Sequence, residues 1–301
     1  MHLPDGFLST PVWAALDVAA VPVAGYMVRR AQRGFEEKKL PLLGVMGAFV
    51  FAAQMINFPV GIATSGHLVG SALLSFTLGP AAASVVMIAI LAIQSLVFQD
   101  GGILALGANV FNMAIAGVIA GYLPYYFWGA GRGRKWAIFL GGVFSVLVAA
   151  LLAISELLLS GIPMSGPVLG VSFSLFCVSA LLEGAITLAV FQAVETLNPT
   201  FIRQPRAQRG LALGLALAAI AFVTAGVLFA SSSPDGLQSL AQTLGIASRA
   251  KALFVSPLAD YQAAFLESAW LRRSGAGLTG VALIYGACVL LGRMVGRQRS
   301  A

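Results

Sequence analysis

The stretch Pro80 to Phe98, PAAASVVMIAILAIQSLVF, runs without a single charged side chain. A helix that crosses a bilayer needs about 20 consecutive, mostly apolar residues, so this stretch predicts a transmembrane helix. Similar runs recur along the 301 residues, of which 59% are hydrophobic and 10% are charged. Soluble domains carry roughly 25% charged residues, because polar groups must face water. The composition therefore predicts an all-α, polytopic integral membrane protein and argues against a soluble enzyme.

The apolar runs predict about nine spans. The third of these is short and rich in Ser, Thr and Gly, and it follows a polar segment of small residues at 57–66. We expect it to be a full span, because a re-entrant segment would reverse the orientation of every later helix. The expected spans are 12–28, 40–56, 67–79, 80–98, 104–127, 136–159, 166–197, 211–230 and 276–291.

The basic residues lie in short clusters between the apolar runs. With the N-terminus outside, the outer side holds only Arg249, Lys251, Arg272 and Arg273 of the eighteen basic residues. Those four lie in a long loop, 231–275, where the positive-inside rule is weak, and the others are cytoplasmic. This pattern predicts a multi-pass protein of the cell membrane with an extracytoplasmic N-terminus. It also accounts for the net charge of +7, so we expect no nucleic-acid partner.

An arginine-bearing segment, 203–209, is predicted to link two modules. The first module, 1–203, holds seven of the expected spans. The second module, 204–301, holds two spans joined by the outer loop. Within that loop, Leu237 to Leu244 is expected to form a short helix on the membrane face.

The chain has two histidines, His2 and His67, and the predicted topology puts both on the outer side. The Met1 amine, the next peptide nitrogen and the His2 imidazole can bind one ion in two small chelate rings, which are flat because the peptide unit is planar. His67 could add a fourth nitrogen and complete a square plane, which favours Ni²⁺ or Cu²⁺. From spacing alone two other interpretations are favoured. His2 would be a solvated tail residue, and His67 a capping or pore-lining side chain.

Several motifs resemble one family, in the expected order along the chain. Met1 to Leu8, MHLPDGFL, resembles the opening of the substrate-specific (S) components of energy-coupling factor (ECF) transporters for nickel and cobalt, the NikM/CbiM family. Thr64 to Leu68, TSGHL, resembles the internal histidine motif of that family. The sequences QDGG at 99–102 and LGANVFNM at 106–113 are also similar to it. The resemblance covers residues 1 to about 200.

The resemblance implies a seven-helix S-component bundle that holds a metal ion. The implied ligands are the Met1 amine, the amide and ring nitrogens of His2, and a ring nitrogen of His67. The ion, Ni²⁺ slightly favoured over Co²⁺, would be the transported substrate, captured at the extracytoplasmic face without an organic cofactor. The implied partners are an ECF coupling (T) membrane protein and cytoplasmic ATPase subunits, besides membrane lipid. The sequence itself has no Walker-type phosphate loop.

The second module resembles the small NikN/CbiN-type subunit, fused in one chain. Its Pro234-Asp235-Gly236-Leu237 stretch is similar to the Pro-Asp-Gly-Leu-Glu signature of such segments. Gln238 stands where the signature has glutamate, which puts the role of that acidic position in doubt but not the module.

Five polar residues are candidates to orient the ligand imidazoles, because hydrogen-bonding groups surround most metal sites. They are Thr64, Ser65, Gln94, Asp100 and Asn109. The alternative is that they cap helices and form hydrogen bonds between neighbouring helices.

A stand-alone metal-ion channel or secondary transporter is the main alternative function. It would need paired ionisable residues at the midplane or a repeat of broken helices. An intramembrane hydrolase would need an HExxH motif or a nucleophile and base pair. Neither pattern is evident in the sequence, and we expect the chain not to be an enzyme.

Overall fold

The computed structural model describes residues 1–34, 39–61, 63–199, 201 and 209–297. The predicted module boundary at 203/204 and all but the last residue of the predicted linker lie outside the described residues. The basic residues Lys38 and Arg299 lie outside them as well.

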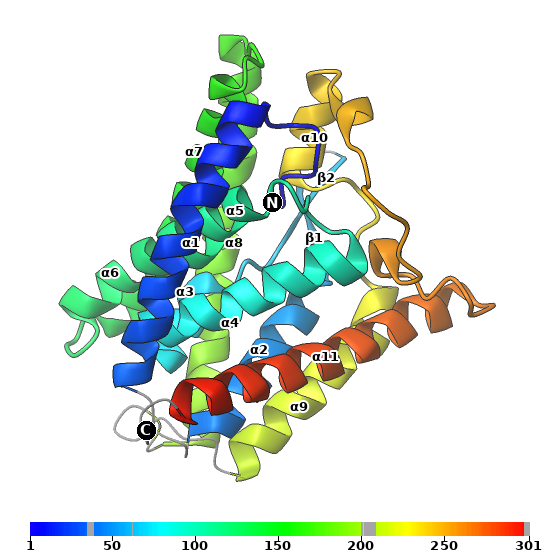
Figure 1. Cartoon of the computed structure of the whole chain (residues 1–301). Coiled ribbons are helices and arrows are strands. Elements are labelled where there is room, and N and C mark those ends of the chain that lie inside the picture. The colour runs from blue at the N-terminus through cyan, green and yellow to red at the C-terminus, as the bar shows by residue number, and fades with distance from the viewer. Residues whose placement is uncertain (35–38, 62, 200, 202–208, 298–301) are drawn as a thin grey trace.

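Seven helices in the described part of the chain are long and apolar enough to cross a membrane, which confirms a polytopic helical membrane protein (Figure 1). They are α1 (Thr10–Arg33), α4 (Pro80–Ile93) continued by η2 (Gln94–Phe98), the series α5 (Leu106–Asn109), η3 (Val110–Gly117) and α6 (Val118–Trp128), α7 (Arg134–Leu159), α8 (Gly166–Leu197), α9 (Arg209–Thr224) with η4 (Gly226–Leu228), and α11 (Ala269–Arg297). A further apolar helix, α2 (Leu40–Gln54), is shorter.

The prediction of a third full span at 67–79 is wrong. Asn57–Gly61 (β1) and Thr64–His67 (β2) pair as an antiparallel hairpin, and only Ser71–Leu78 (α3) is helical. The eight residues of α3 rise about 12 Å, far less than the roughly 30 Å of a bilayer core. Gly70 separates the strand from the helix with a φ of +78°, which an L side chain rarely adopts. The hairpin also differs from the predicted all-α fold, because it forms a two-stranded sheet among the described residues.

The reversal of chain direction that the third span was expected to provide is nevertheless present. The Gln54 side chain, at the end of α2, donates to Val69 O (2.8 Å) and accepts from Gln94 Nε2 (2.8 Å). The ends of α2 and α4 therefore meet at one level, so α3 leads the chain away from that level and α4 returns to it. The side of the membrane on which the N-terminus lies stays a prediction.

The C-terminal helices α9 and α11 pack along α2 (Figure 1). Gly280 of α11 lies directly against Phe51 of α2, since a Cβ at Gly280 would be 2.2 Å from Phe51 Cζ. The loop that connects α9 and α11 forms α10 (Gly236–Thr243), η5 (Ala247–Arg249) and η6 (Ala259–Tyr261). The short helix predicted at 237–244 is therefore confirmed as a helix.

The loop between α9 and α11 folds over the N-terminal segment. Leu237 and Leu240 of α10 are buried in one apolar cluster with Leu3, Phe7 and Phe176. Figure 1 shows the N-terminus among α5, α10 and β2, inside the molecule and not at its edge. The second module thus covers the first residues of the first module.

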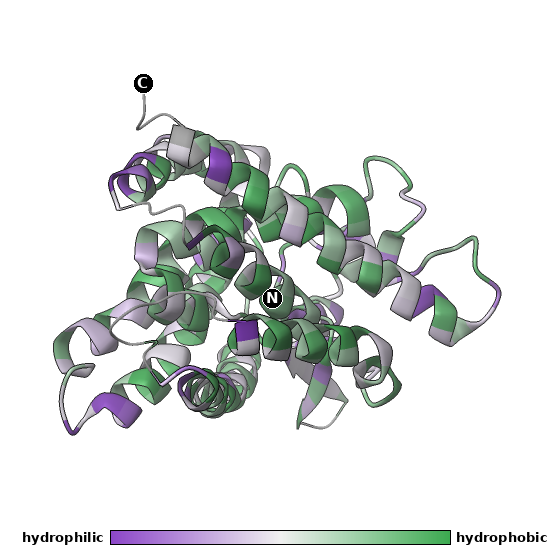
Figure 2. Ribbon diagram, turned by 90° about the horizontal axis from the view of Figure 1, so that it is seen from below, coloured by the Kyte–Doolittle hydropathy of each residue, from purple (hydrophilic) through white to green (hydrophobic). Residues whose placement is uncertain are grey.

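Hydrophobic residues dominate the long helices, and hydrophilic residues gather mainly at helix ends and in loops (Figure 2). In α1 the apolar side chains Val18 and Val21 are 74% and 72% exposed. Large apolar side chains exposed at this level are expected of a helix that faces lipid.

Candidate metal centre

Leu3 anchors the N-terminal segment through its main-chain hydrogen bonds. Its main-chain N–H donates to Asn109 Oδ1 (2.8 Å), and its carbonyl oxygen accepts from Asn109 Nδ2 (3.0 Å). The same carbonyl accepts from Gly102 N (2.8 Å). The predicted candidate Asn109 therefore holds the backbone directly beside His2.

Asp5 is a second anchor of this segment. Its buried carboxylate accepts from the main-chain N–H groups of Ile103 (3.0 Å), Leu104 (2.8 Å) and Ala105 (3.2 Å), just before α5. Such unpaired N–H groups at a helix start favour a carboxylate partner. The two anchors direct Met1 and the His2 ring into the interior.

The Met1 nitrogen meets two side chains there. As an ammonium it donates to His67 Nε2 at 2.8 Å and to Asp235 Oδ2 at 2.7 Å. His67 Nδ1 lies 2.9 Å from Leu68 O, a group that can only accept. Nδ1 therefore carries the ring proton, and Nε2 presents its lone pair to the Met1 nitrogen. This is the tautomer that a metal ligand at Nε2 requires.

The His2 ring lies parallel to the His67 ring, with 5.6 Å between centroids and 7° between planes. His2 is 8% exposed, and its Nδ1 is 3.2 Å from Asp100 Oδ1. Its Nε2 is buried and has no hydrogen-bond partner among the described residues. Buried polar atoms are nearly always paired, so an unpaired one at this position points to a ligand.

The chelate predicted from the sequence needs the His2 ring in a different orientation. Only Nδ1 can close a small ring with the amide nitrogen of the same residue, and here Nδ1 faces Asp100. A half-turn of the ring exchanges Nδ1 with Cδ2 and brings Nε2 to the side that faces Asp100. Metal binding through Nδ1 would thus leave Nε2–H beside a carboxylate, the arrangement common around ligand histidines.

The charges of the site favour a neutral His67 ring and two ionised carboxylates, Asp235 next to His67 and Asp100 next to the His2 ring. Burial and the neighbouring terminal ammonium lower the pKa of His67. Burial alone would raise the pKa of Asp235, but the terminal ammonium and the His67 ring outweigh burial and lower that pKa. Burial likewise opposes ionisation of Asp100, and the His2 ring and the Tyr261 hydroxyl outweigh it, so this pKa is also lowered.

The other predicted candidates lie one step further from the rings. Ser65 Oγ donates to Ser233 O (2.7 Å), and Thr64 Oγ1 lies 3.2 Å from Ser239 Oγ. Gln94 Nε2 donates to the Tyr261 hydroxyl (3.1 Å), which in turn donates to Asp100 Oδ2 (2.6 Å). Thr64 and Ser65 thus attach the hairpin to the second module, and Gln94 supports Asp100.

Sequence reasoning missed two residues that the second module brings to the site, Asp235 and Tyr261. The sequence does carry a signal for Asp235, because this residue lies in the Pro-Asp-Gly-Leu stretch that resembles the signature of the NikN/CbiN-type segments. Tyr261 is the last residue of the short element η6 and lies in no recognisable sequence motif. Tyr261 stacks on Phe98, with 4.9 Å between ring centroids, which fixes its hydroxyl next to Asp100.

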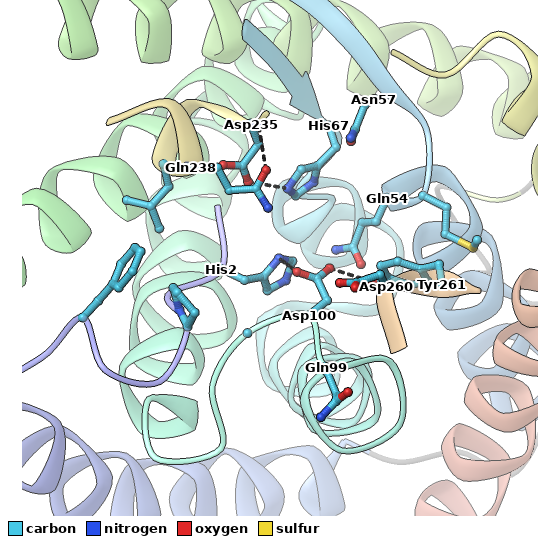
Figure 3. Close-up of a pocket in the computed structure, with 15 residues that line it drawn as sticks. His2, Gln54, Asn57, His67, Gln99, Asp100, Asp235, Gln238, Asp260 and Tyr261 are labelled. Atoms are coloured by element: carbon cyan, nitrogen blue, oxygen red, sulfur yellow. Dashed lines mark hydrogen bonds and ion pairs between the residues drawn. The ribbon is translucent and has the colours of Figure 1, made fainter. Parts of the chain in front are cut away.

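The residues of the candidate site line a cavity of about 250 Å³ (Figure 3). His2, His67, Asp100 and Asp235 all line it, and Figure 3 shows them converging from the N-terminal segment, β2, the loop after η2 and the start of α10. No three His, Cys, Asp or Glu side chains in the described residues lie close enough to hold an ion by themselves.

Two family models match the chain. Residues 2–201 match the family CbiM, described as "Cobalt uptake substrate-specific transmembrane region". Residues 209–297 match the PDGLE domain. The matches follow one another along the chain without overlap.

Similar proteins include two fused transport proteins. One, from Archaeoglobus fulgidus, is provisionally named fused nickel transport protein NikMN and is 39% identical over 82% of this chain and 83% of its own length. The other, the fused nickel transport protein NikMN of Rhodobacter capsulatus, is 28% identical over 94% of this chain and 95% of its own length.

A solved structure also matches. The crystal structure of a transition metal transporter is 33% identical, with a TM-score of 0.58 over 66% of this chain and 94% of that chain.

Proposed function

Because the chain belongs to the CbiM family of cobalt-uptake substrate-specific transmembrane regions and carries a C-terminal PDGLE region, we propose that it captures Ni²⁺, or Co²⁺, at the extracytoplasmic face of the membrane for ATP-driven uptake. At the family level the chain is a nickel/cobalt uptake component of an ECF-type transporter and not an enzyme. The face of capture, the ion and the ligands are the proposed part.

One observation carries the proposal. The Met1 nitrogen lies 2.8 Å from His67 Nε2, next to a His2 ring with an unpaired buried nitrogen. An ion that displaces one proton from the ammonium and one from the His2 amide could bind the Met1 amine, the His2 amide and ring, and His67. Four nitrogens in a plane favour Ni²⁺ or Cu²⁺. The names of the fused relatives, both nickel transport proteins, favour Ni²⁺ of these two.

The remaining parts of the proposal concern assembly. Since family members work in ECF transporters, the expected partners are a coupling (T) membrane protein and cytoplasmic ATPase subunits, within membrane lipid. The N-terminus and the outer loop are proposed to lie outside, because the basic clusters at the opposite helix ends would then be cytoplasmic. The two modules are proposed to meet at 203/204.

Calorimetry with Ni²⁺ and Co²⁺ on the purified full chain tests the ligand set. We expect His2→Ala and His67→Ala each to weaken Ni²⁺ binding by more than the roughly 10–100-fold lost when a residue next to a ligand is changed. Two residues, Gly-Ser, added before Met1 should have the same effect, because they turn the Met1 amine into a peptide nitrogen.

The matched control carries Gly-Ser after the last residue, and it should bind Ni²⁺ like the unmodified chain. Unchanged affinity in the N-terminally extended chain would exclude the terminal chelate. A failure of the unmodified chain to bind either ion would overturn the proposed function as a whole.

A further inference from the structure

We propose that Asp235 is a positioning residue of the metal centre, supplied by the C-terminal module. It holds the Met1 nitrogen against His67 Nε2 before the ion arrives, and it offsets the charge of the complex once the ion is bound. This inference rests on the proposed metal-binding function and adds a residue from the second module to the site.

The first evidence is the contact itself. Asp235 Oδ2 accepts from the Met1 ammonium at 2.7 Å and lies 3.8 Å from His67 Nε2. The Met1, His67 and Asp235 groups in these contacts are 9%, 7% and 13% exposed. In such a partly desolvated site an ion pair is stronger than at the protein surface. Asp235 is thus placed to keep the terminal nitrogen facing His67.

The second evidence is that the Asp235 carboxylate cannot turn freely. Its other oxygen, Oδ1, accepts from Gln238 N at 2.8 Å, and Gln238 Oε1 accepts from Asp235 N at 3.1 Å. This reciprocal pair is the capping box of α10. The neutral Gln238 completes the box without adding a negative charge at the position where the family signature has glutamate.

The third evidence is that the same contacts position Asp235 and His67 together. Ser65 N donates to Pro234 O (2.8 Å), one residue before Asp235. Ser65 lies in β2, which ends at His67. The hydrogen bond therefore links the backbone that carries the proposed ligand to the backbone that carries the carboxylate.

Charge balance explains why a carboxylate suits this position in both states. The metal-free site presents one positive charge to Asp235, the terminal ammonium. The proposed complex also carries one net positive charge, because one deprotonated amide reduces the charge of a divalent ion. An unpaired buried charge is costly, so Asp235 can compensate the ammonium and the complex in turn.

The test compares Asp235→Asn with the unmodified chain by Ni²⁺ calorimetry. Asparagine is as good a helix N-cap as aspartate, so α10 should persist while the charge is lost. We expect roughly 10–100-fold weaker Ni²⁺ binding. We also expect the Met1 amine of the metal-free variant to react faster with an acylating reagent, measured by mass spectrometry, because it loses its ion-pair partner.

Two further variants separate charge from structure. Asp235→Glu restores the charge and should recover most of the lost affinity, which a purely structural role would not predict. Glu267→Gln makes the same acid-to-amide change at an exposed position of the same loop, and it should leave both measurements unchanged. If Asp235→Asn does not fold, Asp235→Ser, which also caps well and cannot reach Met1, takes its place.

The outcomes distinguish this inference from the proposed function. If the unmodified chain binds Ni²⁺ and the Asp235→Asn or Asp235→Ser chain binds it equally well, Asp235 is not part of the site and the proposed function stands. If the unmodified chain does not bind Ni²⁺, the proposed function fails first.

Discussion

At the scale of single residues, the site is built from side chains that hold other groups in place. Leu68 O fixes the proton of His67 on Nδ1, and Asn109 fixes the backbone of Leu3. Neither contact involves a metal, yet each removes a freedom that an ion would otherwise have to restrict on binding. Such pre-organisation is a general source of affinity.

Asp100→Asn tests the contact on the other side of the cavity. Asp100 faces His2 Nδ1 and accepts from the Tyr261 hydroxyl. The variant keeps the shape of the side chain but loses the charge that orients the His2 ring, so we expect Ni²⁺ binding, measured by calorimetry, to weaken roughly 10–100-fold.

Tyr261→Phe is the companion variant, because it removes one hydrogen bond to Asp100 and leaves the carboxylate. Its loss of affinity should be smaller than that of Asp100→Asn. Equal Ni²⁺ affinity in the Asp100→Asn and unmodified chains would show that Asp100 does not support the His2 ring.

The sequence predicts the members of the site better than their partners. The residue chemistry makes Met1, His2 and His67 candidates, because their nitrogens can form a chelate, but it was the family resemblance that selected them over the other roles that spacing alone favours. Asp235 could not be placed there, because it meets Met1 across 234 positions of the chain through folding alone. The sequence could not predict that His2 Nδ1 faces Asp100 either, because the orientation of a ring depends on its neighbours in space.

At the scale of elements, α8 supports the segment that carries His67. The Glu183 carboxylate is fully buried and accepts from Val69 N (2.7 Å) and Gly70 N (2.8 Å). These N–H groups belong to the turn between β2 and α3. The helix thus fixes the backbone two residues after the proposed ligand.

Glu183→Ala should therefore affect both stability and binding. It leaves two buried N–H groups without these acceptors, at a cost of about 1–3 kcal/mol each. We expect a lower thermal unfolding temperature and weaker Ni²⁺ binding, because the His67 segment is released.

Glu156→Gln is the control for this change. Glu156 is a buried carboxylate of α7 that accepts from Asn112, away from the hairpin. This variant should leave Ni²⁺ affinity unchanged. A Glu183→Ala chain that folds and binds Ni²⁺ like the unmodified chain would contradict the supporting role of α8.

Apolar run length predicted most helices well but not the segment between α2 and α4. The span predicted at 166–197 coincides with α8, because a long apolar run in a bilayer has only the helix available to it. The segment at 57–79 has Ser, Thr and Gly among its apolar residues, and its residues 64–66 and 68–77 are buried within protein. There a hairpin is allowed, and hydropathy cannot distinguish it from a short span.

At the scale of the whole molecule, the contact between α11 and α2 joins the two modules. The contact also lies close to the site, because Phe51, which Gly280 touches, packs on Phe98 and Tyr261. The order of the modules along the chain was predictable from the sequence. Their mutual packing was not, since it depends on which apolar faces meet.

Gly280→Leu should disrupt the packing of α11 against α2. The added side chain has no room beside Phe51, and overpacking of this kind typically costs about 1–3 kcal/mol. We expect a lower thermal unfolding temperature and weaker Ni²⁺ binding, because Tyr261 and Asp100 shift with Phe98.

Gly286→Leu is the matched control on the same helix, because no atom lies within 4 Å of a Cβ there. It should leave stability and binding unchanged. Equal effects of the two substitutions would mean that α11 does not transmit its packing to the site.

The hydrogen bond from Ser65 N to Pro234 O connects the two modules, and both modules belong to one polypeptide. A partner on the same polypeptide is present at a high effective concentration, whatever the amount of protein in the membrane. Dilution, which separates two subunits, cannot separate Asp235 from Met1 here. The affinity of this chain for its ion should therefore be independent of expression level, whereas the same two modules made as separate polypeptides would lose the carboxylate as they become scarce.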